Sequence, residues 1–351
     1  MDVPDQAHMA FKKFQKGAIL SQMQFRCLFK KSGISVIGSY ASGNVGDKAI
    51  GKSIVDKLTN SGFDATYFSR YVRGINSPVR ILGGGGVIHQ YRRKKIERDF
   101  DLLNENSMIV GVGVSPVFDP ELRELIRNKI KEVSLVTVRD QRSKQLLEDI
   151  TDKEVHSLAC PAFQLDTPNT TTQDYTGISL RPLPVKGISS EEEKNRIFRH
   201  QLKYNNSLSI NEVKEKYQEN IKNILTKIRN VKHIPFHHFD SDFVEDYDVE
   251  SFPYAYDVND TLRQVSNASR MICMRYHSLV FSILNNKPSL AIAYSPKVAK
   301  LANRADIPCF KPYEEIKLKF KQPSNRDTIL SDSEQNFRLM NDQLSHSELR
   351  T

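Results

Sequence analysis

The segment at residues 270–297 restricts the fold more than any other part of the chain, because two strand patterns flank one helix pattern. Residues 271–274 form a short apolar run, which is typical of a buried parallel strand. The apolar residues at 279–284 repeat at helical spacing, and residues 289–294 form a second apolar run. Pro296 then suits the first turn of a following helix. The segment therefore predicts a strand, a helix and a second parallel strand of an α/β sheet.

Polar and charged side chains follow both of these predicted strands. Arg275 and His277 come directly after the first strand, and Ser295 and Lys297 come after the second. Ligands of open α/β sheets bind outside the carboxyl ends of the strands, so we expect these side chains in one crevice. Arginine, histidine and lysine together predict a site for a small, doubly charged anion. The alternative interpretation is a histidine at a helix start beside a solvated lysine.

The alternation of strands and helices extends back to Gly33. Further predicted strands lie at residues 34–38, 65–69, 79–82, 107–112, 135–138, 155–158, 177–181 and 231–236. Helices are predicted at residues 90–104, 120–132, 141–149, 189–229 and 258–268. A length of 351 residues suggests two domains, and the Thr-, Asn- and Pro-rich residues 166–176 are the predicted linker.

These patterns divide the chain into four parts. They are a basic N-terminal segment at 1–33, an N-terminal domain at 34–166, a C-terminal domain at 176–320, and a polar tail at 321–351 that includes a surface helix near 332–347. The roles of residues 1–33 and 186–220 do not follow from their sequence.

The formal net charge of +9 suits acidic ligands or an anionic membrane surface, with a solvated basic face as the alternative. None of the sequence signatures of nucleic-acid-binding folds is present, so we predict no nucleic-acid partner. Residues 10–31 mix Phe and Leu with Lys and Arg but are too interrupted by charge to span a membrane. This segment is either a basic amphipathic helix at a membrane surface or a helix packed on the protein's own body.

Cysteine and histidine positions argue against disulfides and metal sites. Cys27, Cys160, Cys273 and Cys309 are far apart, which fits a reducing compartment better than a disulfide framework. His233 and residues 237–240 suggest a metal cluster, but no ligand at a standard spacing completes it. We therefore predict no metal site.

Two glycine-rich turns stand after predicted strands, at residues 43–47 and 83–86. Glycines let the backbone approach a ligand closely and permit positive φ. Residues 46–53 also match the letters of a phosphate-binding P-loop. In a P-loop, however, a strand must run into the first glycine, whereas here the strand ends several residues earlier and helical spacing already covers 47–53. We therefore do not predict nucleotide hydrolysis.

Several segments together make the chain resemble the polysaccharide pyruvyl transferase family. These segments are residues 43–47, 83–86, 111–113, 136–140, 178–181, 275–277 and 288–297. The match covers about residues 34–303 and leaves the N-terminal segment and the C-terminal tail outside. The resemblance implies a fold similar to that of the B-type glycosyltransferases, an α/β fold with two Rossmann-like domains that face a cleft.

The resemblance also implies a reaction. The enolpyruvyl group of phosphoenolpyruvate is transferred to two hydroxyls of a sugar in a cell-surface polysaccharide or its precursor, which gives a cyclic ketal and releases phosphate. No cofactor and no metal is implied. The acceptor is a sugar, and a lipid-linked acceptor is compatible with the basic N-terminal segment.

Roles for individual residues follow from this chemistry. Arg139, Lys297 and Arg275 are expected to bind phosphoenolpyruvate, because Arg and Lys suit phosphate and carboxylate groups. His277 is the expected acid that delivers a proton to the methylene carbon, and Asp47 is the expected base for the sugar hydroxyl. Asp47 has an equally strong alternative role as a carboxylate that complements a helix dipole.

Four further residues are expected beside the substrates: Asn44, Gly84, Gly85 and Ser295. Two other functions stay open. One is a nucleotide-sugar-dependent glycosyltransferase of the same architecture, and the other is a non-catalytic anion-binding protein. We expect the protein in the cytoplasm, with the inner face of the membrane as a more specific location.

Overall fold

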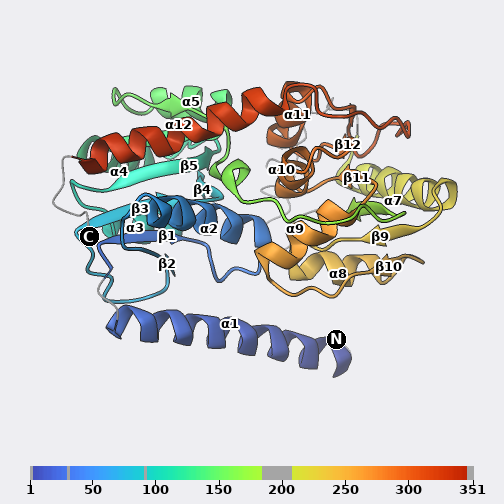
Figure 1. Ribbon diagram of the computed structural model, residues 1–351, viewed down its shortest axis with the longest axis horizontal. Helices are drawn as coiled ribbons and strands as arrows, with labels where there is room; N and C mark the ends of the chain where they lie inside the picture. The colour runs from blue at the N-terminus through green and yellow to red at the C-terminus, as the bar shows by residue number, and fades with distance from the viewer. Residues whose placement is uncertain (1–2, 30–31, 91–92, 184–207, 346–351) are drawn as a thin grey trace. The chain divides into compact units, whose positions relative to one another are not determined.

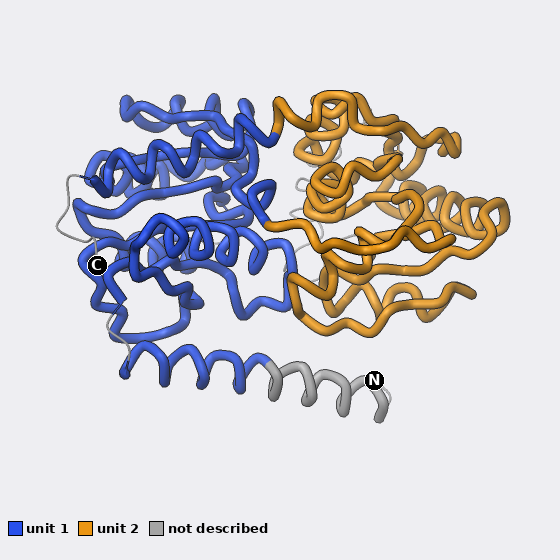
Figure 2. Tube along the Cα trace, viewed as in Figure 1, with its two compact units in different colours: residues 1–165, 330–351 blue, residues 166–329 orange. Residues whose placement is uncertain are grey.

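The computed structural model describes residues 3–29, 32–90, 93–183 and 208–345, with residues 3–15 described as helical backbone alone. The chain divides into two compact units (Figure 2). Unit 1 comprises residues 1–165 and 330–351, and unit 2 comprises residues 166–329.

Unit 1 is built on short apolar strands that alternate with helices (Figure 1). Its strands are β1 (Ile34–Gly38), β2 (Ala65–Ser69), β3 (Val79–Gly83), β4 (Gly86–Ile88), β5 (Met108–Val114), β6 (Leu135–Val138) and β7 (His156–Ser157). Its helices include α2 (Val45–Asn60), α3 (Arg93–Asp101), α4 (Pro120–Glu132), α5 (Gln141–Glu148) and the 3-10 helix η2 (Pro161–Gln164).

The strands of unit 1 pair in parallel in the order β2-β1-β3-β5-β6-β7, and β4 pairs with β5. The chain adds β2 on one side of β1 and every later strand on the other side. The strand order therefore reverses between β1 and β3. Such a topological switch point leaves a crevice at the carboxyl ends of the two strands.

Unit 2 holds a second parallel sheet. Its strands are β8 (Thr176–Ser179), β9 (Val231–His233), β10 (Glu250–Ser251), β11 (Arg270–Cys273), β12 (Ser289–Ile292) and β13 (Cys309–Phe310). Its helices include α7 (Ile210–Lys227), α8 (His238–Val244), α9 (Val258–Asn267), α10 (Tyr276–Leu284) and α11 (Pro296–Arg304). The strand order is β10-β9-β8-β11-β12-β13, so the switch point of this unit lies between β8 and β11.

Burial follows from the apolar runs. Every residue of β5 and of β12 is buried, as expected for parallel strands that helices cover on both faces. In unit 1, Ile96 of α3 and Ile126 of α4 belong to one hydrophobic core with Ile109 of β5. Polar caps set the helix starts: the Asp119 carboxylate accepts hydrogen bonds from the first backbone N–H groups of α4.

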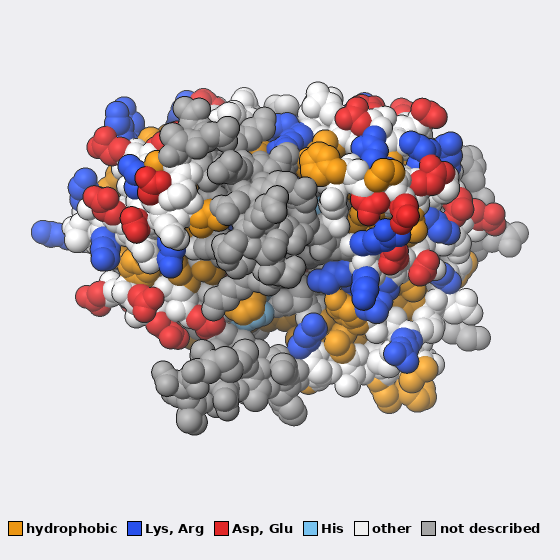
Figure 3. Space-filling view, turned by 180° about the vertical axis from the view of Figure 1, so that it is seen from behind, with side chains coloured by type: hydrophobic (Ala, Val, Ile, Leu, Met, Phe, Trp, Pro, Cys, Tyr) orange, Lys and Arg blue, Asp and Glu red, His pale blue; other side chains and the backbone are white. Residues whose placement is uncertain are grey.

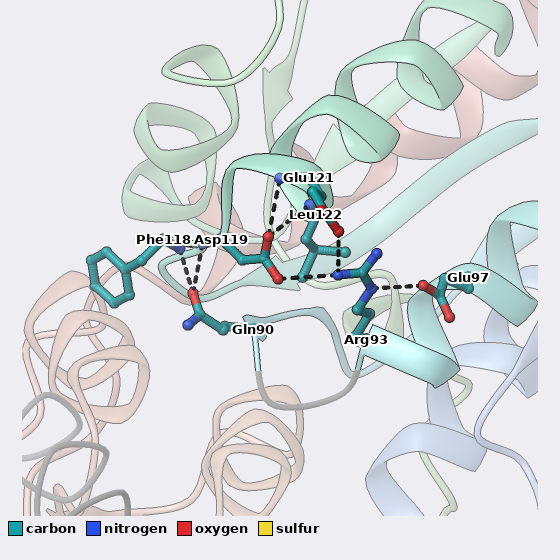
Figure 4. Close-up of polar contacts among 7 residues, drawn as sticks. All are labelled: Gln90, Arg93, Glu97, Phe118, Asp119, Glu121 and Leu122. Carbon is teal, nitrogen blue, oxygen red and sulfur yellow. Dashed lines mark hydrogen bonds and ion pairs between the residues drawn. The ribbon is translucent and has the colours of Figure 1, made fainter.

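The loop that follows β5 is tied to the start of α3 (Figure 4). The side-chain oxygen of Gln90 accepts hydrogen bonds from the backbone N–H groups of Phe118 and Asp119, and Arg93 pairs with Asp119 and Glu121. The ring of Phe118 points away from these contacts (Figure 4) and is 61% exposed. Exposed ion pairs of this kind contribute little to stability, but they fix the path of the loop.

Helix α1 (Val3–Phe29) packs beside β2 through one face of its described side chains. Met23 is buried, and the Gln24 side chain exchanges two hydrogen bonds of 2.9 Å with the backbone of Arg73. Phe25 and Phe29 remain 62% and 74% exposed. In the described part of the chain, no helix combines the length and apolar character that a membrane span requires.

The C-terminal helix α12 (Arg326–Ser345) joins unit 1 through its later turns. The Asn336 side chain donates to the Ala159 carbonyl at 2.9 Å and accepts from the Thr137 hydroxyl at 2.6 Å. The Asp332 carboxylate accepts from the backbone N–H of Ala159 at 2.7 Å. The polar tail predicted at 321–351 thus contains a helix whose turns from residue 330 onward group with the N-terminal unit.

The predicted fold class is confirmed, because each unit holds a parallel α/β sheet. The strands at 34–38, 65–69 and 135–138 have the predicted bounds. The helix predicted at 90–104 is shorter, and Gly86, the last residue of the predicted glycine turn, begins β4, which pairs with β5. The helix predicted at 189–229 is described from residue 210 to 227, and residues 189–207 lie outside the described part. The cleft between the two domains stays a prediction.

Candidate functional site

The switch point of unit 1 carries two of the glycine-rich turns. After β1, the side-chain oxygen of Asn44 accepts the backbone N–H of Gly46 at 3.0 Å and so caps α2. This cap places Asp47 in the first turn of the helix, where it is partly buried. After β3, Gly84 and Gly85 adopt φ values of +92° and +77°, which side chains of L-residues rarely allow.

The glycine turn and Asp47 lie against each other. A Cβ atom at Gly85 would lie 2.6 Å from the Asp47 carboxylate oxygen Oδ1, so a side chain there would displace the carboxylate. The Gly85 carbonyl accepts the backbone N–H of Gly113 at 2.8 Å. A Cβ atom at Gly113 would in turn overlap the guanidinium of Arg139. Asp47, Gly85, Gly113 and Arg139 therefore form one continuous cluster, here called the Asp47–Arg139 cluster.

Both charges of this cluster affect the pKa of the buried Cys160 thiol. Burial raises the pKa of Cys160 to about 11, while the Arg139 guanidinium lowers it and the Asp47 carboxylate raises it. Arg139 itself is buried, and its backbone N–H donates to the Val112 carbonyl at 3.1 Å. The structure thus places three predicted site residues, Asp47, Gly85 and Arg139, at the same edge of one sheet.

The switch point of unit 2 carries two arginines, the buried Arg181 after β8 and the partly buried Arg275 after β11, whose side chain is 14% exposed. The Nε and Nη2 atoms of Arg275 bind both carboxylate oxygens of Asp240, with Nε at 3.0 Å. Burial alone would lower the pKa of Arg275, but the pairing with Asp240 raises it, so the guanidinium stays charged. Arg275 therefore stands in a fixed orientation at the start of α10.

Arg181 and Lys297 flank one tyrosine at the end of β12. The Arg181 guanidinium lies 4.2 Å from the ring centroid of Tyr294, and the Lys297 Nζ atom lies 5.7 Å from it. The Tyr294 hydroxyl also makes side-chain hydrogen bonds with Lys297 and Arg181. Burial lowers the pKa of Arg181, and the nearby charge of Arg275 lowers it further. A bound anion would offset the unfavourable free energy of the buried Arg181 charge.

The pKa of Tyr294 indicates how strong the positive potential of the nearby cations is. Burial alone would raise the pKa of this phenol, but Lys297, Arg181 and Arg275 together lower it to about 7. Among the described residues, the carboxylate of Asp240 pairs with Arg275, one of these three cations. The excess positive charge is therefore large enough to acidify a buried tyrosine.

Hydroxyl groups and helix starts complete this edge. The buried hydroxyls of Ser179, at the end of β8, and of Ser295, at the start of α11, have no hydrogen-bond partner among the described residues. Buried polar groups normally have a partner, so both atoms mark places where a ligand or water would bond. The amino ends of α10 and α11 also point partial positive charge at this edge.

His277 lies in the first turn of α10, buried, with its ring edge-on to Tyr276 at a centroid distance of 5.1 Å. The four candidates of the opening segment thus follow β11 and β12, which are neighbouring parallel strands of unit 2. This group of Arg181, Arg275, His277, Ser295 and Lys297 is here called the cation cluster. Its charges and donors fit a small anion with phosphate or carboxylate oxygens.

Two alternative sites can now be assessed. The residues that match the P-loop letters lie inside α2, which begins at Val45, so they form no phosphate-cradling loop. Within the described residues, no group of three or more His, Cys, Asp and Glu side chains is arranged to hold a metal ion. Asp240, which belongs to the histidine-rich segment considered as a metal site, forms an ion pair with Arg275 instead.

A comparison with models of protein families matches the polysaccharide pyruvyl transferase model over residues 44–296. The match includes the predicted site residues from Asn44 to Ser295 and ends one residue before Lys297. The chain belongs to the polysaccharide pyruvyl transferase family. This is an enzyme family, and membership implies a pyruvyl donor and a sugar acceptor.

Three solved structures are distant matches to this pyruvyl transferase family member. UDP-GlcNAc 2-epimerase from Methanocaldococcus jannaschii, in complex with UDP-GlcNAc and UDP, is 10% identical and has a TM-score of 0.47, with 88% of this chain and 99% of that chain covered. An uncharacterized protein from Klebsiella pneumoniae is 14% identical with a TM-score of 0.45, covering 86% and 97%. The wall teichoic acid polymerase TagF is 9% identical with a TM-score of 0.43, covering 98% and 99%. At these scores we infer no function from them. The comparison with curated proteins gives no match.

Sequence reasoning missed three residues that shape the cation cluster, namely Arg181, Asp240 and Tyr294. Arg181 ends a predicted strand, so its position was a usable signal. Asp240 lies 35 residues before its partner Arg275, and no spacing rule links them. The strand prediction included Tyr294 as an apolar residue and gave no sign of its acidity.

Proposed function

We propose that the protein transfers the pyruvyl group of phosphoenolpyruvate to two hydroxyls of a sugar in a cell-surface polysaccharide or its precursor. The observation that carries this proposal is the cation cluster, in which three cations and the carboxylate of Asp240 lie together among the described residues of unit 2. Phosphoenolpyruvate carries a phosphate and a carboxylate, so it matches a site with excess positive charge.

Lys297 and Arg181 bind the donor most directly in this proposal. Burial lowers the pKa of Arg181, so an anion that joins it gains more than an anion at an exposed arginine would. Arg275 adds its charge from a position that Asp240 fixes, and the Ser295 hydroxyl supplies a hydrogen-bond donor. In unit 1, Arg139 is proposed as a further donor contact.

The reaction needs one acid, one base and no redox partner. A sugar hydroxyl attacks the central carbon of phosphoenolpyruvate while His277 delivers a proton to the methylene carbon, which becomes a methyl group. A second hydroxyl then attacks the same carbon, the bond to the phosphate oxygen breaks, and phosphate leaves with the electron pair. Asp47 accepts the proton of the first hydroxyl, and His277, which has given up its own proton, accepts the proton of the second. Asn44, Gly84 and Gly85 lie beside the substrates as proposed contacts.

We further propose that the acceptor is lipid-linked and that the protein works in the cytoplasm at the inner face of the membrane. Support comes from the exposed apolar side chains at the end of α1, Phe25, Leu28 and Phe29, beside the exposed Arg26. Apolar and basic residues together are what an anionic lipid surface binds.

Phosphate release from phosphoenolpyruvate, measured with a panel of sugar glycosides and with mass analysis of the products, tests the function. We expect release that depends on one sugar, and a product heavier by one pyruvate less one water. His277→Ala should lower kcat by about 10²- to 10⁴-fold, the usual cost of losing a general acid. If His277→Ala keeps most of its kcat, the acid is another group. Turnover of a UDP- or CMP-sugar without any reaction of phosphoenolpyruvate would instead identify a glycosyltransferase.

A further inference from the structure

An aromatic surface follows β9 in unit 2, and neither the proposed donor site nor the proton transfers use it. His237, His238 and Phe239 lie in consecutive positions, with ring centroids 4.1–4.9 Å apart. Tyr254 meets His238 edge-on at 6.2 Å. Phe239 is 42% exposed, which is unusual for so large an apolar ring. These four rings are here called the aromatic platform.

The aromatic platform lies on the same sheet edge as the cation cluster. In the strand order, β9 is the direct neighbour of β8, which Arg181 follows, and β8 is the neighbour of β11, which Arg275 follows. Neighbouring strands are about 4.8 Å apart. The platform is therefore displaced from the two arginines by on the order of 5–10 Å, which is comparable with the width of one or two pyranose rings.

One ion pair joins the platform to the cation cluster. Asp240 lies directly after Phe239 in α8, and it pairs with Arg275 across the edge of the sheet. Burial raises the pKa of Tyr254, the charges of Tyr256 and Asp240 raise it further, and the charge of Arg275 lowers it.

The base of the platform is rigid. Phe243 of α8 stacks on Tyr217 of α7 with a centroid distance of 5.8 Å and an interplanar angle of 3°. The Tyr217 hydroxyl donates to the carbonyl of Arg181 at 3.0 Å. The helix that carries the rings is thereby held to β8, and a rigid support is what a precise binding surface requires.

We propose that the aromatic platform binds the pyranose ring of the acceptor and presents its hydroxyls to the donor; this rests on the proposed function. One face of many pyranoses consists of C–H groups, which pack on aromatic rings, while the hydroxyls project sideways. Histidine and tyrosine add nitrogen and oxygen atoms at the rim, and such groups orient a polar ligand on an apolar surface. A nucleobase can also stack on aromatic rings, which makes a nucleotide the opposing outcome.

The chain contains no tryptophan, so Phe239→Trp places a single indole on the platform. Its emission is followed while methyl glycosides of glucose, galactose, mannose and their N-acetylamino forms are added, each as the α and the β anomer. We expect a saturable emission change with at least one glycoside. Phe118→Trp, at a 61% exposed position in unit 1, is the matched control and should not respond.

The unlabelled protein gives an independent measurement. Saturation-transfer NMR should detect the same glycoside bound to the wild type, and Phe239→Ala should weaken this binding by about 2- to 10-fold, because it removes the aromatic stacking. Phe239→Ala should keep the stabilisation by phosphoenolpyruvate, because it leaves the cation cluster intact.

Three results would each contradict sugar binding at the platform. No glycoside changes the indole emission, UMP or CMP changes the emission instead, or Phe239→Ala binds the glycoside as tightly as the wild type does. Failure of the proposed function looks different, because phosphoenolpyruvate would then fail to stabilise the wild type. A glycoside response without stabilisation by phosphoenolpyruvate supports the platform and removes the proposed donor.

Discussion

The pKa of Tyr294 reflects the charges of the cation cluster, because Lys297, Arg181 and Arg275 lower it. Its hydroxyl contacts Lys297 and Arg181, the two groups that we propose to bind the donor most directly. As a neutral phenol it leaves their charges to the substrate. As a phenolate it competes with the substrate for the same charges.

We therefore predict that the affinity for phosphoenolpyruvate falls as pH rises through the Tyr294 pKa of about 7. The loss is up to about tenfold per pH unit when a single proton is linked to binding. The phosphate group, with a second pKa near 6, is already ionised in that range. Titration calorimetry between pH 7 and 9 measures the effect. Tyr294→Phe, which cannot ionise, should lose this dependence, and an equal dependence in both proteins contradicts the competition.

The sequence predicted the positions of site residues that directly follow a buried parallel strand. Arg275, His277 and Lys297 follow apolar runs, and the carboxyl ends of parallel strands meet at one edge. The partner of Arg275 could not be predicted, because Asp240 reaches it only through the tertiary fold. The acidity of Tyr294 depends on three cations from three segments, so it too requires the folded structure.

Among the elements, the buried parallel strands were the easiest to predict, since their apolar runs are uninterrupted. The two-residue strands β10 and β13 and the short helix α8 have too few residues for a periodic pattern. Strand β4 forms because its residues extend beside β5, although the glycines before it favour a turn. The aromatic platform stands on one of these unpredicted elements.

Helix α1 has two different faces in its described part. Met23 and Gln24 contact unit 1, while Phe25, Leu28 and Phe29 are exposed and the rings of Phe25 and Phe29 touch at 4.4 Å. Figure 3 shows hydrophobic side chains gathered at the lower right, where α1 ends. This face is the membrane contact that we propose.

We predict that the wild type floats with vesicles that contain an anionic lipid, and floats less with neutral vesicles. Replacing Phe25, Leu28 and Phe29 together by Ser should lower vesicle binding by more than about tenfold, because burial of each such side chain contributes roughly 1.5–3 kcal/mol. Phe118→Ser is the control, since it removes an equally exposed ring from another surface.

Two results speak against this contact. Equal flotation of the triple variant and the wild type removes the membrane from the account. A dimer that the triple variant abolishes, without any vesicle binding, assigns the face to a second copy of the chain.

At the scale of the whole molecule, both units carry several of their candidate residues at a topological switch point. In unit 1 these are the turns after β1 and β3, and in unit 2 the ends of β8 and β11. The formal charge is +9, and on the face in Figure 3 the Lys and Arg side chains of the described residues are interspersed with Asp and Glu. The local excess in the cation cluster therefore matters more for the donor than the total charge.

Thermal unfolding with phosphoenolpyruvate tests the central claim most directly. A ligand at 100 times its Kd stabilises the folded protein by about 2.7 kcal/mol, which should raise the Tm of the wild type by about 2 °C or more. Lys297→Ala should lose this shift at the same concentration. Lys214→Ala, which removes an exposed charge from α7, should keep it. An unchanged shift in Lys297→Ala, or a shift with nucleotide sugars and none with phosphoenolpyruvate, would contradict the account.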